Sequence, residues 1–522
     1  MNLADGLRIN SWRYPDKVAA VFNEQRLTYT ELNARANKFA HAMLARGFQR
    51  GDKVSIILNN CMEFLEIYHG LARIGVVSVP INFRLVPREK LYIIDNSDSV
   101  ALILGSEFLP EMEEKDKLSK IAPADYIVVG KREDTPATCS NYEDMLVEMP
   151  ESEPAVDLNE EDLFYLGYTS GTTGFPKGAM IQTKGTLDIV KNAMVRTSGR
   201  DGIDITQRVF LAIMPICHSN SIWATLITFW VGGTNIIFPT GKFDPERVLQ
   251  LIENEKVTTT SMVPTMITRI LELPDEVKNK YELSSLTSLG SSSAPLLTKT
   301  KEAALRFFKN ARFSEGYGST ETGALTTLRH KDQLRKVRSI GKPNPGIEIK
   351  LLDEDGTEVK QGEVGTLWAR ARSAFVGYYK DHAKTAQARR GDWVTAGDMA
   401  YMDEEGFYFL VDRKNDMIIS GGENVYPAEI EEVIIQHPCV AEVAVFGVPH
   451  EQWGEEVKAM VILRENQRAT EVELLEFCKE RLAGYKRPRS VNFVEDFPRT
   501  ATGKVLKRIL KEPFWRGQER MI

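Results

Sequence analysis

The sequence predicts an α/β fold: a large N-terminal part with parallel or mixed sheets flanked by helices, and a small mobile α+β C-terminal lobe. Three observations carry this. Strand-length apolar segments alternate with stretches of helical period near the start. A chain of 522 residues, 43% hydrophobic, can bury more than one core. Polar residues at 412–416 separate two apolar segments, which predicts a hinge at 414–416 between a part covering 1–413 and a lobe covering 417–522.

The alternation is clearest near the N-terminus. Apolar residues at helical spacing predict a helix through residues 32–44, capped by Thr30 and ended by Gly47. A strand, a helix and a second strand are expected at 54–58, 64–71 and 76–79. Acids and prolines are frequent across 111–162, which predicts a surface connection rather than core.

Composition excludes several classes of protein. The net charge of -7 and the pI near 5.8 argue against a nucleic-acid partner. The five cysteines lack CxxC spacing, so neither a zinc site nor a disulfide framework is predicted. The start shows no signal-peptide pattern, and we expect a cytoplasmic protein.

One long span lacks charged residues. No Lys, Arg, Asp or Glu occurs between Arg208 and Lys242. Its apolar core at 222–230 ends before Gly232 and falls short of the ~20 residues that a membrane-spanning helix needs. We therefore expect a buried helix, a glycine turn and a strand at 236–238, and no transmembrane segment.

The segment from Tyr168 to Gly178 reads Tyr-Thr-Ser-Gly-Thr-Thr-Gly-Phe-Pro-Lys-Gly and follows an expected strand at 163–166. Small hydroxyl residues and glycines let backbone N–H groups close around an anion, and Lys177 adds a positive charge. It is no Walker A loop, because Gly178 follows the lysine where Ser or Thr is required. We predict a phosphate-binding loop, joined by a short connection to a helix through 187–194.

This segment resembles the phosphate loop of the adenylate-forming superfamily, which includes acyl-CoA synthetases, luciferases and peptide-synthetase adenylation domains. The resemblance implies that the loop binds ATP, with Thr172 and Lys177 contributing to catalysis. The ATP-binding residues so implied are Thr169, Ser170, Gly171, Thr172, Thr173, Gly174 and Lys177.

Two further segments resemble nucleotide-binding elements of the same family: the small-residue turn within Leu289 to Leu296, which in the family packs beside adenine, and Gly316 to Glu321. In Gly316-Tyr317-Gly318-Ser319-Thr320-Glu321 an aromatic between glycines can stack on a base, and a carboxylate can hold Mg²⁺. The resemblance places Tyr317 against adenine, Thr320 on phosphate and Glu321 on the metal, with Glu321 also catalytic. Its other implied cofactor-binding residues here are Ser293, Ala294, Glu315 and Gly318.

The C-terminal third carries the remaining matches. The resemblance implies that Asp398 and Arg413 hold the ribose, although Ala396 interrupts the usual Thr-Gly-Asp order. Asn415 stands at the hinge, where the family usually has Asp or Lys. The implied path of coenzyme A passes Gly421 and Gly422, and Lys504 is the implied catalytic lysine that contacts the carboxylate and the α-phosphate.

The acyl pocket is predicted from a Pro-x-x-His element that resembles the family's. The pocket residues are His218, Trp223, Gly290, Ser291 and Ser292. They suggest an apolar or aromatic acid and show no fixed cation for a second carboxylate. A medium- or long-chain fatty acid is favoured, and an aryl acid of the benzoate or cinnamate type stays open.

The implied reaction has two halves and needs ATP, Mg²⁺ and coenzyme A. A carboxylate attacks the α-phosphorus of ATP to give an acyl-adenylate and pyrophosphate, and a thiol then displaces AMP. The alternatives are a different acceptor, a catalytically silent nucleotide-binding scaffold of the same fold, and a kinase-like NTPase. A homodimer is left open.

Overall fold

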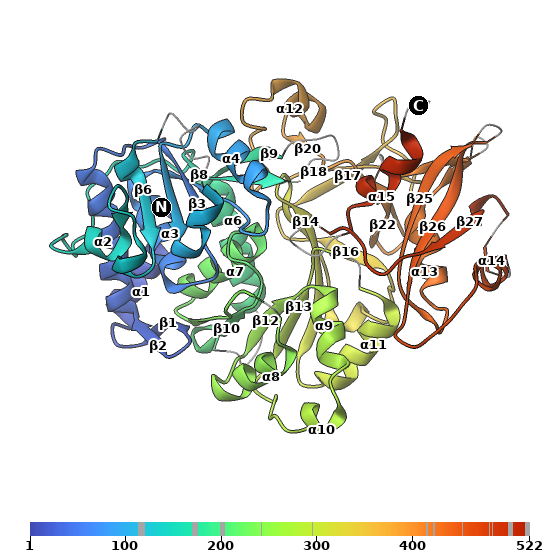
Figure 1. Ribbon diagram of the computed structural model, residues 1–522, viewed down its shortest axis with the longest axis horizontal. Helices are drawn as coiled ribbons and strands as arrows, with labels where there is room; N and C mark the ends of the chain where they lie inside the picture. Colours follow the sequence, from blue (N-terminus) through green and yellow to red (C-terminus); the bar gives the residue numbers. More distant parts are fainter. Residues whose placement is uncertain are drawn as a thin grey trace. The chain divides into compact units, whose positions relative to one another are not determined.

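The computed structural model describes residues 1–112, 121–169, 176–198, 204–241, 243–294, 296–413, 416–420, 423–450, 453–479, 481–482, 484–499 and 505–516 (Figure 1). The chain divides into two compact units. Unit 1 comprises Met1–Val337, Pro343–Glu348 and Ala369–Val394. Unit 2 comprises Arg338–Lys342, Ile349–Trp368 and Thr395–Ile522.

Unit 1 contains a seven-stranded sheet within the described residues, in the order β7-β6-β5-β3-β4-β8-β9. The pairs β3–β4, β3–β5 and β5–β6 are parallel and β8–β9 is antiparallel, so the predicted parallel or mixed sheet is confirmed. The strands are β3 (Lys53–Ile57), β4 (Val77–Pro80), β5 (Ala101–Gly105), β6 (Tyr126–Val129), β7 (Ser140–Asn141), β8 (Leu163–Thr169) and β9 (Lys177–Gln182).

Helices accompany this sheet, and the predicted early helices are present. They are α2 (Tyr29–Ala45), α3 (Met62–Ile74), α4 (Pro87–Asn96), α5 (Tyr142–Leu146) and α6 (Thr183–Ser198). The cap prediction is wrong: Thr28, not Thr30, accepts a hydrogen bond from the Glu31 backbone N–H, and the Glu31 side chain accepts one from the Thr28 N–H. This reciprocal pair satisfies two N–H groups at the helix start, which Thr30 inside the helix cannot do.

Two strands contradict expectations. The stretch 111–162, read as surface connection, contains β6, whose Ile127 and Val128 are fully buried between β5 and β7. The acids and prolines belong to its flanks, which hid a four-residue apolar segment. The short connection expected before the helix at 187–194 is instead β9, which pairs with β8 before α6 begins.

A second set of strands in unit 1 runs β15-β14-β13-β12-β10-β11-β1-β2. The pairs from β14 to β1 are parallel, and both end pairs are antiparallel. The bounds are β1 (Val18–Phe22), β2 (Gln25–Thr28), β10 (Val209–Ala212), β11 (Thr234–Ile237), β12 (Thr259–Met262), β13 (Ser288–Ser291), β14 (Arg312–Ser319) and β15 (Gly323–Leu328).

The helices of this region include the one expected from the uncharged span. That helix is α7 (Ser219–Trp230), and a turn at Gly232 leads into β11, as predicted. No helix among the described residues combines the length and the apolarity that crossing a bilayer requires. The others are α8 (Pro245–Asn254), α9 (Pro264–Leu271), α10 (Asp275–Lys278) and α11 (Thr298–Phe307). Unit 1 also holds α12 (His382–Ala388), β19 (Arg389–Arg390) and β20 (Trp393–Val394).

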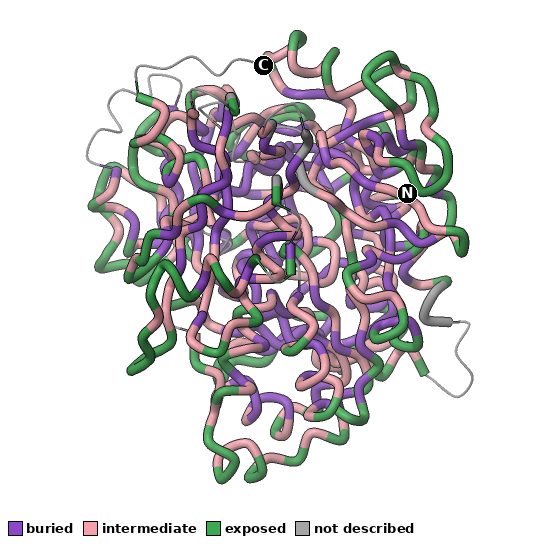
Figure 2. Tube along the Cα trace, turned by 90° about the vertical axis from the view of Figure 1, so that its right-hand side faces the viewer, coloured by how far each residue is buried: buried purple, intermediate pink, exposed green. Residues whose placement is uncertain are grey.

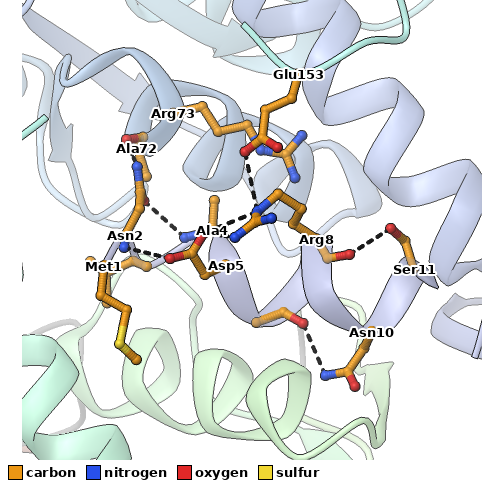
Figure 3. A network of polar contacts seen from close by, with 12 residues as sticks. Met1, Asn2, Ala4, Asp5, Arg8, Asn10, Ser11, Ala72, Arg73 and Glu153 are labelled. Carbon is orange, nitrogen blue, oxygen red and sulfur yellow. Dashed lines mark hydrogen bonds and ion pairs between the residues drawn. The ribbon is translucent and has the colours of Figure 1, made fainter. Parts of the chain in front are cut away.

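Within unit 1, polar contacts attach the first helix, α1 (Asp5–Arg13), and the residues before it to the rest of the unit (Figure 3). Asn2 Nδ2 donates to the Ala72 carbonyl at 2.7 Å, and Arg8 pairs with Asp5 at 2.8 Å and with Glu153 at 3.3 Å. Asn10 Nδ2 donates to the carbonyl of Phe229 in α7 at 2.6 Å. These contacts join the N-terminal residues to α3 and α7.

Unit 2 is of α+β type. Its strands include the antiparallel pairs β16–β22 and β21–β22 and a sheet in the order β24-β23-β26-β25, with β27 parallel to β26. The helices are α13 (Pro427–Ile434), α14 (Glu471–Lys479) and α15 (Lys507–Trp515). The strands are β16 (Ser339–Pro343), β21 (Asp398–Met402), β22 (Tyr408–Arg413), β23 (Ile418–Ser420), β24 (Glu423–Val425), β25 (Val440–His450), β26 (Gly454–Leu463) and β27 (Ser490–Phe493). β16, through Pro343, and β17 (Glu348–Leu352) and β18 (Gly365–Arg370) have residues in both units.

Buried positions lie mostly toward the inside of the Cα trace, and exposed positions are most frequent on its outer turns (Figure 2). Unit 1 has large apolar clusters around its two groups of strands, and the described C-terminal residues have clusters of their own around β25 and β26. The apolar clusters around β25 and β26 are therefore separate from those of unit 1.

Candidate active site

Four side chains from separate segments of unit 1 meet where β8 ends. Thr169 is the last residue of β8, and Lys177 is the first of β9. Glu321 lies between β14 and β15, and Tyr378 follows later in the chain. The Tyr378 hydroxyl donates to Glu321 Oε1 at 2.9 Å, Thr169 Oγ1 donates to the same oxygen at 3.4 Å, and Lys177 Nζ lies 4.8 Å from the centre of the Tyr378 ring. The structure thus brings together three of the predicted site residues.

This cluster combines a carboxylate with a lysine in a partly dehydrated place. Glu321 is 8% exposed and Tyr378 6% exposed. Burial lowers the pKa of Lys177, the nearby Lys384 acts in the same direction, and Glu321 and Asp381 oppose the shift. An ammonium that has lost part of its hydration shell interacts more strongly with an incoming anion than a fully hydrated one does.

Because Gly167 has no side chain, Thr320 can lie close to strand β8. A Cβ at Gly167 would lie 2.6 Å from Thr320 Cγ2, so a side chain in β8 would push Thr320 away. Gly318 serves a different end, because a Cβ there would collide with the carbonyl of Gly323 across the β14–β15 pair. The backbone of the hairpin therefore requires glycine at 318 whether or not a nucleotide lies beside it.

Tyr378 was not predicted from the sequence. Its segment, 374–379, reads Ala-Phe-Val-Gly-Tyr-Tyr and contains no acid, base or nucleophile that would attract attention. The one signal in the sequence was an aromatic residue directly after a glycine. In the structure that glycine, Gly377, has a φ of +149°. A Cβ on Gly377 would lie 2.8 Å from Thr385 Cγ2, so this close turn excludes larger residues.

Glu315 has a partner inside the protein. Lys301 of α11 is 1% exposed, and its Nζ lies 2.5 Å from Glu315 Oε1 on β14. Burial raises the pKa of Glu315 above its ordinary value, and Lys301 opposes that shift. Two residues along the strand, Tyr317 is half-buried and pairs with Thr326 of β15.

Three of the predicted acyl-pocket residues, His218, Trp223 and Ser292, lie on or contact the first turns of α7. His218 is the N-cap residue, and its Nε2 lies 3.1 Å from Asn82 Nδ2. The amide nitrogen can only donate, so Nε2 accepts, as a neutral imidazole does. Burial, with a smaller effect of Arg84, lowers the pKa of His218 to about 4, which agrees with the neutral form.

Side chains from β8 and from the residue after β13 reach the same turn. Tyr165 of β8 donates to Ser219 Oγ at 2.9 Å, and Asn220 Nδ2 donates to Ser292 Oγ at 2.5 Å. Trp223, one turn further along α7, is half-buried and packs in the same apolar cluster as Tyr165, and its Nε1 has no hydrogen-bond partner among the described residues. Asn82, Tyr165 and Asn220 are site neighbours that the sequence did not single out, because isolated polar residues carry no pattern.

The end of β13 supplies the remaining predicted residues of unit 1. Gly290 and Ser291 pair with Ser314 and Glu315 of β14. Ser291 is 2% exposed, and its Oγ has no hydrogen-bond partner among the described residues. The next turn exposes Ser293, with φ +72°, and Ala294.

In unit 2 the two predicted ribose residues are neighbours. Asp398 opens β21 and Arg413 ends β22, and the two are directly opposed in the antiparallel register. Thr395 Oγ1 accepts from the Gly397 backbone N–H at 3.0 Å and donates to the Leu367 carbonyl at 2.7 Å, which shapes the turn before Asp398. Asp398 is 8% exposed.

Several predicted residues lie outside the described residues. They are Ser170, Gly171, Thr172, Thr173, Gly174, Asn415, Gly421, Gly422 and Lys504. In the basic stretch 484–489, Lys486 Nζ lies 2.8 Å from both carboxylate oxygens of Glu429, so its charge is compensated within unit 2.

A magnesium ion fits the carboxylate of Glu321. Hydrogen bonds from Tyr378 and Thr169 use one oxygen, and no hydrogen bond or ion pair from a described residue uses Oε2. Across the described residues, no group of three or more His, Cys, Asp or Glu side chains could form a protein-only metal site. Magnesium in nucleotide enzymes is commonly held by one or two carboxylates together with phosphate oxygens and water, and Glu321 can supply such a ligand.

Comparison with known proteins identifies the family. The model of the AMP-binding enzyme family matches residues 7–379, and that of the AMP-binding enzyme C-terminal domain matches residues 429–504. The chain therefore belongs to the AMP-binding enzyme family. The resemblance to adenylate-forming enzymes predicted from the sequence is confirmed.

Characterised relatives span nearly the whole chain. Long-chain-fatty-acid–CoA ligase FadD13 of Mycobacterium tuberculosis is 34% identical over 499 residues, covering 94% of this chain and 93% of that protein. A 2-succinylbenzoate–CoA ligase of Bacillus mycoides is 31% identical over 500 residues, covering 95% and 96%. The crystal structure of the anthranilate CoA ligase AuaEII with anthranoyl-AMP superposes with a TM-score of 0.88 at 29% identity, covering 98% and 97%.

These matches confirm the predicted fold class and the enzyme class, an AMP-forming acid–CoA ligase. ATP, Mg²⁺ and coenzyme A, as predicted, are what adenylate-forming CoA ligases use. The relatives act on fatty, aryl and other acids, so membership establishes an acyl- or aryl-CoA ligase without naming the acid.

Proposed function

We propose that this enzyme activates a mainly apolar carboxylic acid as its acyl-adenylate and transfers the acyl group to coenzyme A, with a medium- or long-chain fatty acid as the preferred substrate. The observation that supports it best is the meeting of Lys177, Glu321 and Thr169 at the end of β8. Two negatively charged reactants must approach one another in the first half-reaction. A lysine beside a carboxylate that can hold a metal ion would reduce the electrostatic repulsion between these reactants.

In this proposal each residue acts through its own charge or hydrogen bonds. Glu321 would hold Mg²⁺, which when bound neutralises phosphate charge, and Lys177 would bind phosphate oxygens. The hydroxyl of Thr320, next to Gly167, would donate a hydrogen bond to a phosphate oxygen. The carboxylate oxygen of the acid attacks the α-phosphorus, the bond to the pyrophosphate oxygen breaks, and pyrophosphate leaves. The thiolate sulfur of coenzyme A then attacks the acyl carbon, and AMP leaves with the oxygen.

The nature of the acid is inferred from α7. Ile222, Leu226 and Phe229 of this helix are buried, and the span from Val209 to Gly241 carries no charged residue. Neutral His218 and the hydrogen-bonded Ser292 would line the entrance without offering a charge to a second carboxylate. An aryl acid is the second candidate, because Tyr165 and Trp223 belong to one apolar cluster and could offer aromatic contacts to it.

The residues outside the described part complete the proposal. Lys504 would bring a second positive charge to the carboxylate and the α-phosphate, and Gly421 with Gly422 would border the approach of the thiol. We propose that the lobe turns about Asn415 between the two half-reactions. Lys504→Ala should then abolish pyrophosphate exchange yet still convert supplied acyl-adenylate and coenzyme A to thioester, whereas Gly422→Leu should do the reverse.

A product assay over a panel of acids tests the function. ATP, Mg²⁺ and acids of graded chain length, together with benzoate and cinnamate, are incubated with and without coenzyme A. We expect AMP and pyrophosphate in equal amounts, dependent on the acid, and thioester only when coenzyme A is present. ADP as the product would contradict adenylation, and absence of any acid-dependent product would indicate a silent nucleotide binder. Strict preference for aryl acids would replace the fatty-acid proposal by the second candidate.

A further inference from the structure

One aromatic side chain touches both charged groups of the cluster. The Tyr378 hydroxyl donates to Glu321 Oε1 at 2.9 Å, while the face of its ring lies 4.8 Å from Lys177 Nζ. The phenol and the carboxylate are each less than one-tenth exposed. Bonds from neutral donors to a buried carboxylate are strong and directional, and an ammonium over an aromatic face gains further attraction.

The backbone around Tyr378 connects the two sides of the cluster. On the β9 side, Val376 N–H donates to Met180 O at 3.0 Å, Met180 N–H to Gly377 O at 2.9 Å, and Tyr379 N–H to Gly178 O at 2.8 Å. On the other side, Phe375 N–H donates to the Glu321 carbonyl at 2.8 Å. Residues 375–379 therefore join the strand that begins with Lys177 to the turn that carries Glu321.

Thr385 holds the tyrosine itself. Its hydroxyl accepts from the Tyr378 backbone N–H at 2.8 Å and donates to the Asp381 carbonyl at 2.7 Å. The Phe375 ring meets the Tyr378 ring edge-on with centroids 4.9 Å apart. The phenol is thus held from its backbone and from its ring, so that its hydroxyl meets the carboxylate in one direction.

We infer that Tyr378 is a positioning residue for the metal carboxylate: its hydroxyl occupies Oε1 of Glu321 and so turns Oε2 toward Mg²⁺–ATP, while its ring holds the Lys177 ammonium beside it. The inference rests on the proposed adenylation function. Thr169, at 3.4 Å from the same oxygen, supports the orientation with a weaker bond.

The test compares two adjacent tyrosines. Tyr378→Phe removes the hydroxyl and keeps the ring. Tyr379→Phe is the matched control, because the Tyr379 hydroxyl donates to Asp98 at 2.8 Å and makes no contact with Glu321. For wild type and both variants, the rise in melting temperature with a non-hydrolysable ATP analogue is followed as Mg²⁺ is titrated. Acid-dependent ATP–pyrophosphate exchange is measured over the same Mg²⁺ series.

A hydrogen bond to a charged group contributes enough to change metal affinity by roughly ten-fold. We therefore expect Tyr378→Phe to raise the half-saturating Mg²⁺ concentration roughly ten-fold in both measurements, with exchange at saturating Mg²⁺ within about three-fold of wild type. Tyr379→Phe should leave the Mg²⁺ midpoint unchanged. Thr169→Val, a second variant, should raise it by a smaller factor.

A lower melting temperature of Tyr378→Phe with an unchanged Mg²⁺ midpoint would show a purely structural residue and overturn the inference. An equal shift in Tyr379→Phe would overturn it as well. If wild type itself shows no Mg²⁺-dependent stabilisation by the analogue and no exchange with any acid, the proposed function fails, and this outcome is distinguishable because it does not depend on Tyr378.

Discussion

Glu315 and Glu321 lie in the same hairpin region, yet the first pairs with a buried lysine, whereas the second, among the described residues, accepts its side-chain hydrogen bonds from hydroxyl groups. Lys301 pairs with Glu315 at 2.5 Å, whereas Tyr378 and Thr169 donate to Glu321 and no lysine or arginine among the described residues forms an ion pair with it. A carboxylate already paired with a buried cation has little to offer a metal ion. One that is oriented by neutral donors keeps its charge for an incoming cation.

The difference explains how one strand can carry two acids with different tasks. Glu315 couples β14 to α11, which fixes the strand on which Tyr317 is presented. Glu321 stands past the end of β14, within reach of the strand that begins with Lys177. We therefore propose that a cofactor contact at residue 315 would come from the strand backbone, because the Glu315 carboxylate is already paired with Lys301.

The largest effect is expected at Lys301. Replacing it by Met leaves Glu315 buried without its partner, and the free energy of unfolding should fall by about 3–5 kcal/mol. Urea denaturation measures the loss. The double variant Lys301→Met, Glu315→Leu removes both charges and should recover most of it. A single variant as stable as wild type would show that the pair does not couple α11 to β14.

The next effect is on the reaction. Glu321→Gln keeps the shape and the hydrogen bond from Tyr378 but removes the charge, so exchange of pyrophosphate should fall roughly 100-fold or more at saturating Mg²⁺. Its melting temperature should stay close to that of wild type. Glu315→Gln, assayed where it is folded, should lose stability and keep most of its exchange rate. Near-normal exchange in Glu321→Gln would remove the metal assignment.

His218 extends the comparison to a buried base. Its pKa is lowered to about 4, from 6.5, chiefly by burial. Between these values the unfolded chain binds a proton that the native protein does not, so this group makes stability rise with pH from 4 to 6.5 and contributes no further change above that range. Relative to His218→Asn, wild type should lose about 2 kcal/mol on going from pH 7.5 to pH 5.

Unfolding of both proteins by urea at several pH values gives this difference. Asn keeps a favoured N-cap residue on α7 and does not titrate. His69, whose pKa is lowered to about 4 in the same way, is present in both proteins and cancels. A difference that does not vary with pH would mean that His218 titrates normally and is not the neutral acceptor for Asn82.

The smallest effect is expected at Trp223. Because its side chain packs against buried apolar residues beside the proposed acyl pocket and bears no charge, Trp223→Ala should change the ratio of kcat/KM between a long-chain and a short-chain acid by about ten-fold. The KM for ATP should not change. A raised KM for ATP with an unchanged acid ratio would place the acyl pocket elsewhere.

Much of the fold could be predicted because burial leaves a periodic pattern. The strands β3, β4, β8 and β11 and the helices α2, α3 and α7 follow from apolar spacing and turn residues. Two failures have local causes. β9 follows Pro176 and contains Gly178, so its strand character depends on pairing with β8. The cap at Thr28 was visible as Thr-x-x-Glu, a stronger signal than the hydroxyl of Thr30 alone.

The site was predictable only where a motif resembled the family. Lys177, Thr169 and Glu321 were found in this way, and the structure brings them together. Tyr378 could not be found, because its role depends on a contact with Glu321 between distant parts of the chain. The direct opposition of Asp398 and Arg413 likewise depends on the register of β21 and β22, which the sequence around either residue does not predict.

The assignment of Glu321 as the metal ligand is best tested with Mn²⁺ in place of Mg²⁺. Its binding is measured by electron paramagnetic resonance in the presence of a non-hydrolysable ATP analogue. Wild type, Glu321→Gln and Glu315→Gln are titrated under conditions in which all three are folded. We expect the Mn²⁺ affinity of the ternary complex to fall at least about ten-fold in Glu321→Gln and to stay at the wild-type value in Glu315→Gln. Wild-type affinity in Glu321→Gln, or an equal loss in both variants, would contradict the assignment of Glu321 as the carboxylate that holds the metal.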